Sequence, residues 1–137
     1  GQRTAEIRDL AAALLLDQRL DYLDMSLWDL AKPAHDDAFE GQSLLDIFTA
    51  LPRKGVALGA AGKLYGAAQC QNALDQGLDF IMVGRAGIVH HDFPQRACAD
   101  LEFVMADLPV TREHLRQERL GPPFIDYMAT WKGFVAD

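Results

Sequence analysis

The chain has 137 residues, of which 50% are hydrophobic and 24% are charged, a composition typical of an ordered globular domain rather than a disordered one. Its net charge of −7 argues against a nucleic acid or an anionic membrane as partner, because both repel a protein without a concentrated basic patch. No apolar run in the sequence approaches the roughly 18 residues that a membrane-spanning helix needs.

The cysteines and the N-terminal residues bear on the cellular compartment of the protein. Cys70 and Cys98 lie far apart and form no CxxC motif, so neither a zinc site nor a disulfide framework is suggested. The first residues lead directly into a helical pattern rather than a signal peptide. We therefore expect a reduced, cytoplasmic environment.

The first part of the chain predicts a helix, a strand and a long loop. Apolar residues recur at helical spacing over residues 5–17, with Thr4 as the expected N-cap. Residues 22–27 alternate between apolar and polar side chains, which predicts a strand with one face of each kind. Residues 28–42 lack a clear period and are expected to form a loop after this strand.

The middle of the chain predicts two further helices, each followed by a strand. One helix is expected to begin at Ser43, and the segment GVALG, residues 55–59, predicts a short apolar strand. The next helix covers residues 67–76 and ends at Gly77, and residues 78–85 predict a buried strand. Because strands that alternate with helices form βαβ units, we expect a parallel α/β sheet or barrel.

The strand signal ends at Arg85, and helices follow. Three short helices are predicted, over residues 93–100, 111–119 and 123–131. Gly121 is expected to close the second of these. On the third, Phe124, Tyr127 and Trp131 recur at helical spacing, which predicts a packing face in the core or at an interface.

Two glycines close consecutive predicted strands: Gly59, and Gly84 with Arg85 directly after it. Ligands bind at the carboxyl ends of parallel strands, where a phosphate can meet backbone N–H groups that no Cβ covers. A guanidinium there adds charge-assisted hydrogen bonds, so the pattern indicates a phosphate site. Alternatively, the glycines are turn residues and Arg85 is a surface ion-pair residue. Lys63 is interpreted as a solvated loop lysine.

Other polar residues give weaker signals. His90, His91 and Asp92 are adjacent, so their side chains point in different directions, and no third ligand is evident at a useful spacing. No metal site is expected from them. Asp24 and Ser26 share one face of the first strand, where they either line a cavity or form hydrogen bonds in the interior.

These segments resemble a known family, the NADH:flavin oxidoreductases related to old yellow enzyme, which are TIM barrels that carry FMN. DYLDMS at 21–26, VALGAAGKLY at 56–65 and GLDFIMVGRAGIVHHDFP at 77–94 look like the sixth, seventh and eighth barrel strands of the family. The tail GPPFIDYMATWKGFVAD, 121–137, is similar to the C-terminal helix of bacterial members. The resemblance covers most of the chain.

The resemblance implies an α/β fold that is the C-terminal part of a TIM (β/α)8 barrel. About three parallel strands with their helices, barrel strands six to eight, would occupy residues 1–100, and a C-terminal helical extension would occupy 101–137 of the same single domain. A complete barrel takes about 250 residues, so the N-terminal strands are missing. A sheet cut in this way leaves edges exposed, which predicts self-association or domain swapping.

By the same resemblance, the FMN phosphate contacts the backbone at Gly59, Ala60, Val83 and Gly84, and Arg85 adds its side chain. The catalytic residues of the family lie on the earlier strands, so no catalytic residue is assigned here. A complete member would take electrons from NAD(P)H into FMN and pass hydride to a small-molecule substrate, an electron-poor alkene. The fragment alone is expected to be inactive.

Two other functions stay open. The chain could belong to another FMN- or phosphate-binding TIM-barrel enzyme, because paired glycines at strand ends recur among such barrels. It could also be a noncatalytic α/β module that binds a phosphorylated ligand or a protein.

Overall fold

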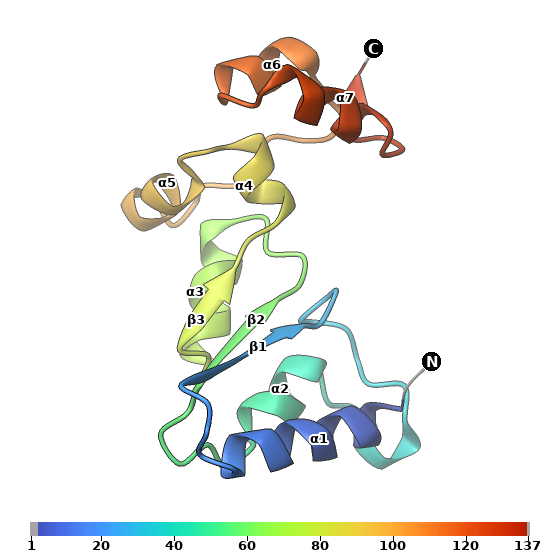
Figure 1. The fold of residues 1–137 in the computed structure, drawn as a ribbon, viewed down its shortest axis with the longest axis vertical. Coiled ribbons are helices and arrows are strands. Elements are labelled where there is room, and N and C mark those ends of the chain that lie inside the picture. The colour runs from blue at the N-terminus through green and yellow to red at the C-terminus, as the bar shows by residue number, and fades with distance from the viewer. Residues whose placement is uncertain (1–2, 137) are drawn as a thin grey trace. The chain divides into compact units, whose positions relative to one another are not determined.

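The computed structural model describes residues 3–136, which form a mixed α/β protein with seven helices and short parallel strands in two small sheets (Figure 1). The chain divides into two compact units. The first contains the residues up to Leu64 together with Cys70–Met82. The second contains Tyr65–Gln69 and the residues from Val83 onward. The predicted alternation of helices with parallel strands is confirmed in the first unit.

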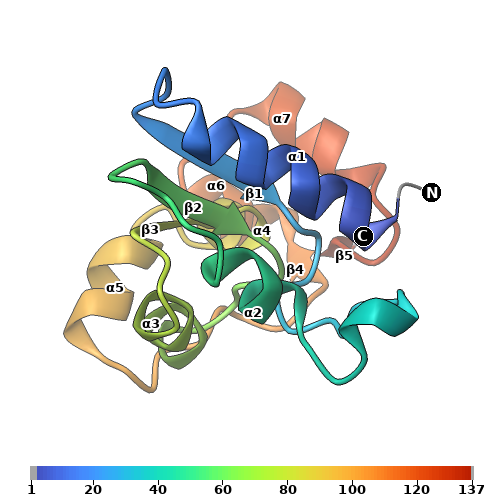
Figure 2. The ribbon, with the colours of Figure 1, turned by 90° about the horizontal axis from the view of Figure 1, so that it is seen from below.

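The first unit is built around a three-stranded parallel sheet. Its strands are β1 (Tyr22–Ser26), β2 (Ala57–Ala61) and β3 (Phe80–Met82). Its helices are α1 (Thr4–Leu16), the short 3-10 helix η1 (Asp37–Phe39), α2 (Leu44–Thr49) and the larger part of α3 (Ala67–Asp75). The strand order is β1-β2-β3, with β2 paired on both sides, as Figure 2 shows.

Local capping explains where the helices of the first unit begin and end. Ser43 caps α2 as expected: its Oγ accepts the Asp46 N–H at 3.1 Å, and the Asp46 carboxylate accepts the Ser43 N–H at 3.0 Å. Thr4 is not the N-cap of α1 but its first residue: Arg3 has the extended backbone of an N-cap, and its N–H donates to the Glu6 carboxylate at 3.4 Å. Gly77 follows α3 with a φ of +112°, as predicted.

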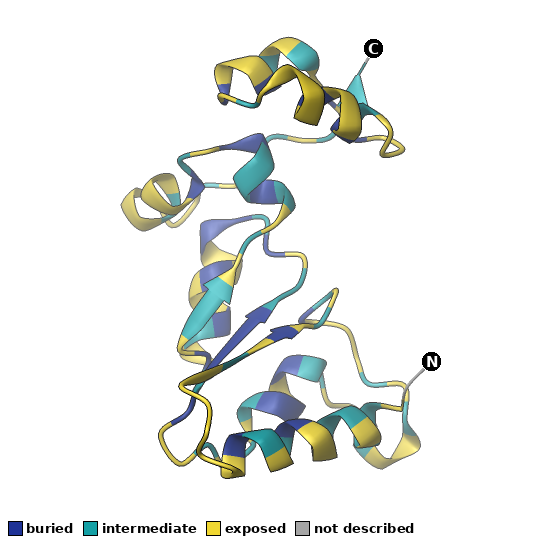
Figure 3. Cartoon of the chain, viewed as in Figure 1, coloured by how far each residue is buried: buried dark blue, intermediate teal, exposed yellow. Residues whose placement is uncertain are grey.

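The sheet of the first unit has one buried and one open face, so the alternation predicted for residues 22–27 is confirmed (Figure 3). Met25 and Leu58 are buried on one face together with Leu15 of α1. Asp24 and Ser26 are exposed on the other, and neither lines an enclosed interior within the first unit. The open face therefore lacks a covering layer within this unit.

The positions of β2 and β3 correct two predictions. β2 begins at Ala57, two residues later than the predicted strand 55–59, so Gly59 lies in the middle of the strand and not at its end. β3 is shorter than the predicted strand 78–85 and lies at the edge of the sheet, so it is not buried: Met82 is 45% exposed. In the register of the sheet, Phe80 pairs with Gly59, and the Phe80 ring occupies the space above Gly59.

The second unit consists of short helices and a two-stranded sheet. Its helices are α4 (Arg85–Val89), α5 (Phe93–Ala99), α6 (Arg112–Gln117) and α7 (Pro122–Ala129). Its strands are β4 (Val110–Thr111) and β5 (Val135–Ala136), which pair in parallel. Helices α5, α6 and α7 confirm the three predicted helices, whereas α4 and both strands were not predicted.

Gly121 does not close α6, contrary to the prediction. Arg119 adopts the left-handed conformation instead, with a φ of +65°, and the N–H of Leu120 donates to the carbonyl of Leu115 at 3.0 Å. This bond is the hydrogen bond that ends a helix in a Schellman motif. Gly121 has a φ of −70° and is the N-cap of α7.

The aromatic residues of α7 do not face the core, so that part of the prediction is wrong. Phe124, Tyr127 and Trp131 are 43%, 52% and 40% exposed, whereas Ile125 and Met128 form the buried side of the helix. The exposed rings contact one another, with centroids 5.8 Å apart for Phe124 and Tyr127 and 5.9 Å apart for Tyr127 and Trp131. A role for this aromatic row at an interface stays a prediction.

The longest helix, α1, has 13 residues, and no helix within residues 3–136 is long and apolar enough to cross a membrane. Both cysteines are free thiols. Cys98 is exposed on α5, whereas Cys70 is buried, and burial raises the pKa of its thiol. Cys70 is therefore an inert core residue.

We predict that Gly59→Ala destabilises the protein by about 1–3 kcal/mol, the usual cost of overpacking. A Cβ at this position would lie 2.0–2.4 Å from ring atoms of Phe80. Urea unfolding measures the change, and Phe80→Ala in the Gly59→Ala background should recover part of the loss. Gly87→Ala is the matched control, because its Cβ meets only Val83 Cγ2 at 3.6 Å and alanine favours a helix. Equal effects of the two single substitutions would contradict the packing explanation.

Candidate functional site

The predicted phosphate-binding residues of β2 are buried. Gly59 and Ala60 lie in the central strand of the sheet, and the ring of Phe80 lies directly over Gly59. The packing of Phe80 is therefore sufficient to explain glycine at position 59. These two residues belong to the first unit, whereas Val83, Gly84 and Arg85 belong to the second.

The turn between β3 and α4 contains the other three predicted residues. Val83 and Gly84 lead into α4, and Arg85 is the first residue of the helix. A Cβ on Gly84 would meet no atom within 4 Å, and its φ is −97°, so neither packing nor a left-handed backbone requires glycine there. Gly84 is also exposed, so the backbone at this turn is accessible to a ligand.

Arg85 is held by a residue that the sequence analysis did not identify. Its Nη1 donates to the Tyr65 hydroxyl at 3.2 Å, within the second unit. Among the described residues, no carboxylate lies within ion-pair distance of Arg85, so the alternative of a surface ion-pair residue is not supported. Its guanidinium is a half-buried cation that is oriented by a neutral hydroxyl, which suits an anionic ligand.

Lys63 is exposed, as expected, but its ammonium group has a specific partner in the first unit. Its Nζ lies 2.9 Å from Oδ2 of Asp29, whose Oδ1 accepts the Ala31 N–H at 3.2 Å. The hydrogen bond from Lys63 lowers the pKa of Asp29 below its ordinary value. Lys63 thus stabilises the loop after β1.

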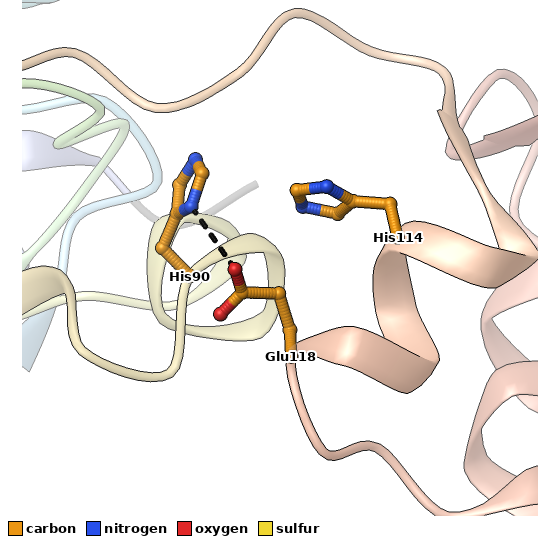
Figure 4. A group of neighbouring side chains, drawn as sticks. All are labelled: His90, His114 and Glu118. Carbon is orange, nitrogen blue, oxygen red and sulfur yellow. Dashed lines mark ion pairs between the residues drawn. The ribbon is translucent and has the colours of Figure 1, made fainter.

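The second unit contains a cluster of histidines around one buried carboxylate. Glu118, at the C-terminal end of α6, points toward His90 at the end of α4, and His114 of α6 lies near both residues (Figure 4). The side chains of Glu118 and His90 are only 9% and 7% exposed. Burial of these groups requires partners, because an unpaired carboxylate away from water is costly.

Each oxygen of Glu118 has a different environment. Oε2 accepts two hydrogen bonds from His91, one from the backbone N–H at 2.9 Å and one from Nδ1 of the ring at 2.6 Å. Oε1 faces Nδ1 of His90 at 3.6 Å and the Arg96 guanidinium at 3.9 Å. Oε2 is therefore fully used, whereas Oε1 makes only longer contacts.

These surroundings favour the charged form of Glu118 and the neutral form of His90. Burial alone would raise the pKa of Glu118, but the hydrogen bonds from His91 and the nearby imidazoles bring it below its ordinary value. Burial lowers the pKa of His90, and this outweighs the attraction of Glu118. The cluster thus holds an ionised carboxylate beside a neutral imidazole.

The sequence analysis found His90, His91 and Asp92 but missed the residues that complete the cluster. Two groups have ligand atoms that all lie within 4.8 Å of one another: His90, His114 and Glu118, and His91, Asp92 and Glu118. Glu118 thus lies near enough to act as a third ligand in both groups, contrary to the expectation from the sequence. The available signal was the four-residue spacing of His114 and Glu118, which places both on one side of a helix.

A scan against models of protein families finds no match for this chain, and a search of curated proteins finds none either. The resemblance to the flavin oxidoreductases therefore rests on the three strand segments and the tail alone. A functional assignment has to be argued from the geometry of the residues.

We predict that Asp29 and Lys63 stabilise the first unit by a coupling energy of about 0.2–1 kcal/mol, the usual range for an ion pair that solvent partly screens. A double-mutant cycle of Asp29→Asn and Lys63→Met, followed by urea unfolding, measures this coupling. Because the folded-state pKa of Asp29 is lowered from 3.8, the stabilisation is present above that pH and is lost as the pH falls through the folded-state pKa. A coupling that persists in strong acid would contradict the ion-pair explanation.

Proposed function

We propose that this chain is the C-terminal part of an FMN-dependent NAD(P)H oxidoreductase of the old yellow enzyme type, and that it supplies part of the site for the FMN phosphate. FMN would bring the hydride-transfer chemistry, and an electron-poor alkene would be the substrate of the complete enzyme. The residues of this chain would bind the cofactor and not react. The fragment alone would therefore be inactive.

The sheet of the first unit supports the barrel part of the proposal. Its three strands are parallel, lie in sequential order, and are joined through α2 and α3, as consecutive strands of a (β/α)8 barrel are. The face that carries Asp24 and Ser26 is exposed, and so are Tyr22 and Met82 on the same side. In a complete barrel this face would point to the interior. With free edges at β1 and β3, it would also favour self-association of the chain.

The turn after β3 carries the phosphate part of the proposal. Gly84 is exposed and no packing contact at its position requires glycine, and Arg85 follows it with no carboxylate partner among the described residues. Tyr65 fixes the guanidinium through a single hydrogen bond, so the remaining N–H donors of Arg85 can serve a phosphate. This combination of an open turn and an oriented, uncompensated cation is the observation that favours an anionic ligand.

The residues of β2 contribute less to the proposal than the resemblance implies. Gly59 and Ala60 are buried in the central strand, where their backbone groups belong to the sheet. A role in FMN binding is therefore less well supported for Gly59 and Ala60 than for the other three predicted residues. The proposal rests on Val83, Gly84 and Arg85.

We predict that the protein binds FMN more tightly than riboflavin, since the two flavins differ only in the phosphate group. Arg85→Ala should weaken FMN binding by about 1.5–3 kcal/mol, the range for hydrogen bonds to a charged group, and leave riboflavin binding unchanged. Quenching of flavin fluorescence during a titration measures both affinities. Tyr65→Phe should have a smaller effect, because it frees the guanidinium without removing its charge.

Arg19→Ala is the matched control, because Arg19 is an exposed arginine of the first unit that pairs, within residues 3–136, with Asp17 alone. It should leave both affinities unchanged. Equal binding of FMN and riboflavin, or no effect of Arg85→Ala, would remove Arg85 from a phosphate site. Arg85-dependent binding of inorganic phosphate without any preference for FMN would favour the noncatalytic phosphate-binding module instead.

A further inference from the structure

We propose that His90, His114 and Glu118 form a binding site for a divalent transition metal, with Zn²⁺ as the best-suited ion. The site lies entirely within the second unit and does not involve the proposed phosphate-binding residues. It would tie the end of α4 to α6.

The donor atoms are already gathered. One potential ligand atom from each of the three residues lies within 4.8 Å of the others, and Nδ1 of His90 is 3.6 Å from Oε1 of Glu118. Bonds of about 2.0–2.2 Å from nitrogen and carboxylate oxygen to zinc bring ligands to little more than 3 Å from one another. Nδ1 of His90 and Oε1 of Glu118 would have to approach each other by about half an ångström, and the other separations, which are at most 4.8 Å, would have to shorten by no more than about 1.6 Å.

His90 supplies an independent indication of a ligand. Its side chain is 7% exposed, yet its Nδ1 has no hydrogen-bond partner nearer than Oε1 of Glu118, which lies 3.6 Å away and at which it is directed, as Figure 4 shows. A buried polar atom without a partner is costly in a folded protein. A metal ion between Nδ1 and Oε1 would satisfy both atoms.

The surroundings of the three residues resemble the outer shell of a metal site. His114 donates its Nε2–H to the carbonyl of Val89 at 2.8 Å, a contact that fixes the orientation of its ring. The two hydrogen bonds from His91 hold Oε2 of Glu118, so Oε1 stays available for the metal. Ligating carboxylates are commonly fixed in this way.

Coordination by His90 has one defined cost. The N–H of Ala106 donates to Nε2 of His90 at 2.9 Å, so the neutral ring carries its proton on Nδ1. A metal at Nδ1 takes the place of that proton, which moves to Nε2 and displaces the Ala106 hydrogen bond. The amide of Ala106 is therefore a direct reporter of metal binding at this position.

The donor set selects the class of ion. Two imidazoles and one carboxylate suit zinc and its first-row neighbours, whereas calcium and magnesium prefer oxygen ligands only. Three protein ligands leave a fourth position for water. Because the ligands come from the end of α4 and from α6, the bound ion would connect these two helices.

The test is a calorimetric titration of the whole chain with ZnCl₂ alone, after treatment with a chelator, at neutral pH. We expect one ion per chain in the wild type, and a loss of affinity of at least about 10-fold in Glu118→Gln and in His114→Ala. His35→Ala is the matched control, because His35 is the one histidine of the chain outside this cluster and lies in the first unit. It should bind zinc like the wild type.

A measurement on the wild type guards against variants that fail to fold. Zinc should shift the amide resonance of Ala106 in a nitrogen–proton correlation spectrum, at one equivalent of metal. Absence of stoichiometric binding, retention of affinity in Glu118→Gln and His114→Ala, or an unmoved Ala106 amide would each overturn the proposal. The cluster would then be a hydrogen-bonded contact between α4 and α6 without a metal.

Discussion

The small residues of the central strand are the constraint on which the first unit depends. In β2, Ala57, Gly59 and Ala61 share the open face of the sheet, and the missing side chain at Gly59 leaves the space that Phe80 fills. Tyr22 from the opposite strand meets the Phe80 ring edge-on at 5.6 Å. Aromatic residues of the two edge strands, β1 and β3, thus lie over the same face of the central strand. Cross-strand contacts of this kind stabilise a sheet where no helix covers it.

In the second unit, the packing depends in a similar way on one buried acidic residue, Glu118. The Glu118 carboxylate contacts the backbone and ring of His91, the ring of His90 and, at longer range, the guanidinium of Arg96. These groups belong to the region around α4 and α5, whereas Glu118 ends α6. A buried carboxylate is tolerated only where such partners surround it, so the packing of these short helices depends on its contacts. Apolar side chains support these contacts, because Val89, Phe93, Leu115, Ile125 and Met128 are buried although each helix is only five to eight residues long.

The features that the sequence predicted well are those with a local cause. The glycine after α3, at position 77, and the alternation along β1 depend only on near neighbours, and both were correct. The length and burial of β3 depend on its place at the edge of the sheet, and the left-handed residue after α6 is Arg119 rather than the glycine two positions later. Likewise, Tyr65 and Glu118 reach partners 20 and 27 positions away, and no spacing rule on a single segment reports such contacts.

The chain passes between the two units more than once, which limits how its segments can be exchanged during evolution. The backbone passes from one unit to the other after Leu64, after Gln69 and again after Met82. The short stretch that provides the hydroxyl for Arg85 is thus inserted in the sequence of the first unit, although it belongs to the second. Neither unit is a contiguous module. Recombination that exchanged the C-terminal half as one block would separate Arg85 from the tyrosine that orients it, so the two units are constrained to be inherited together.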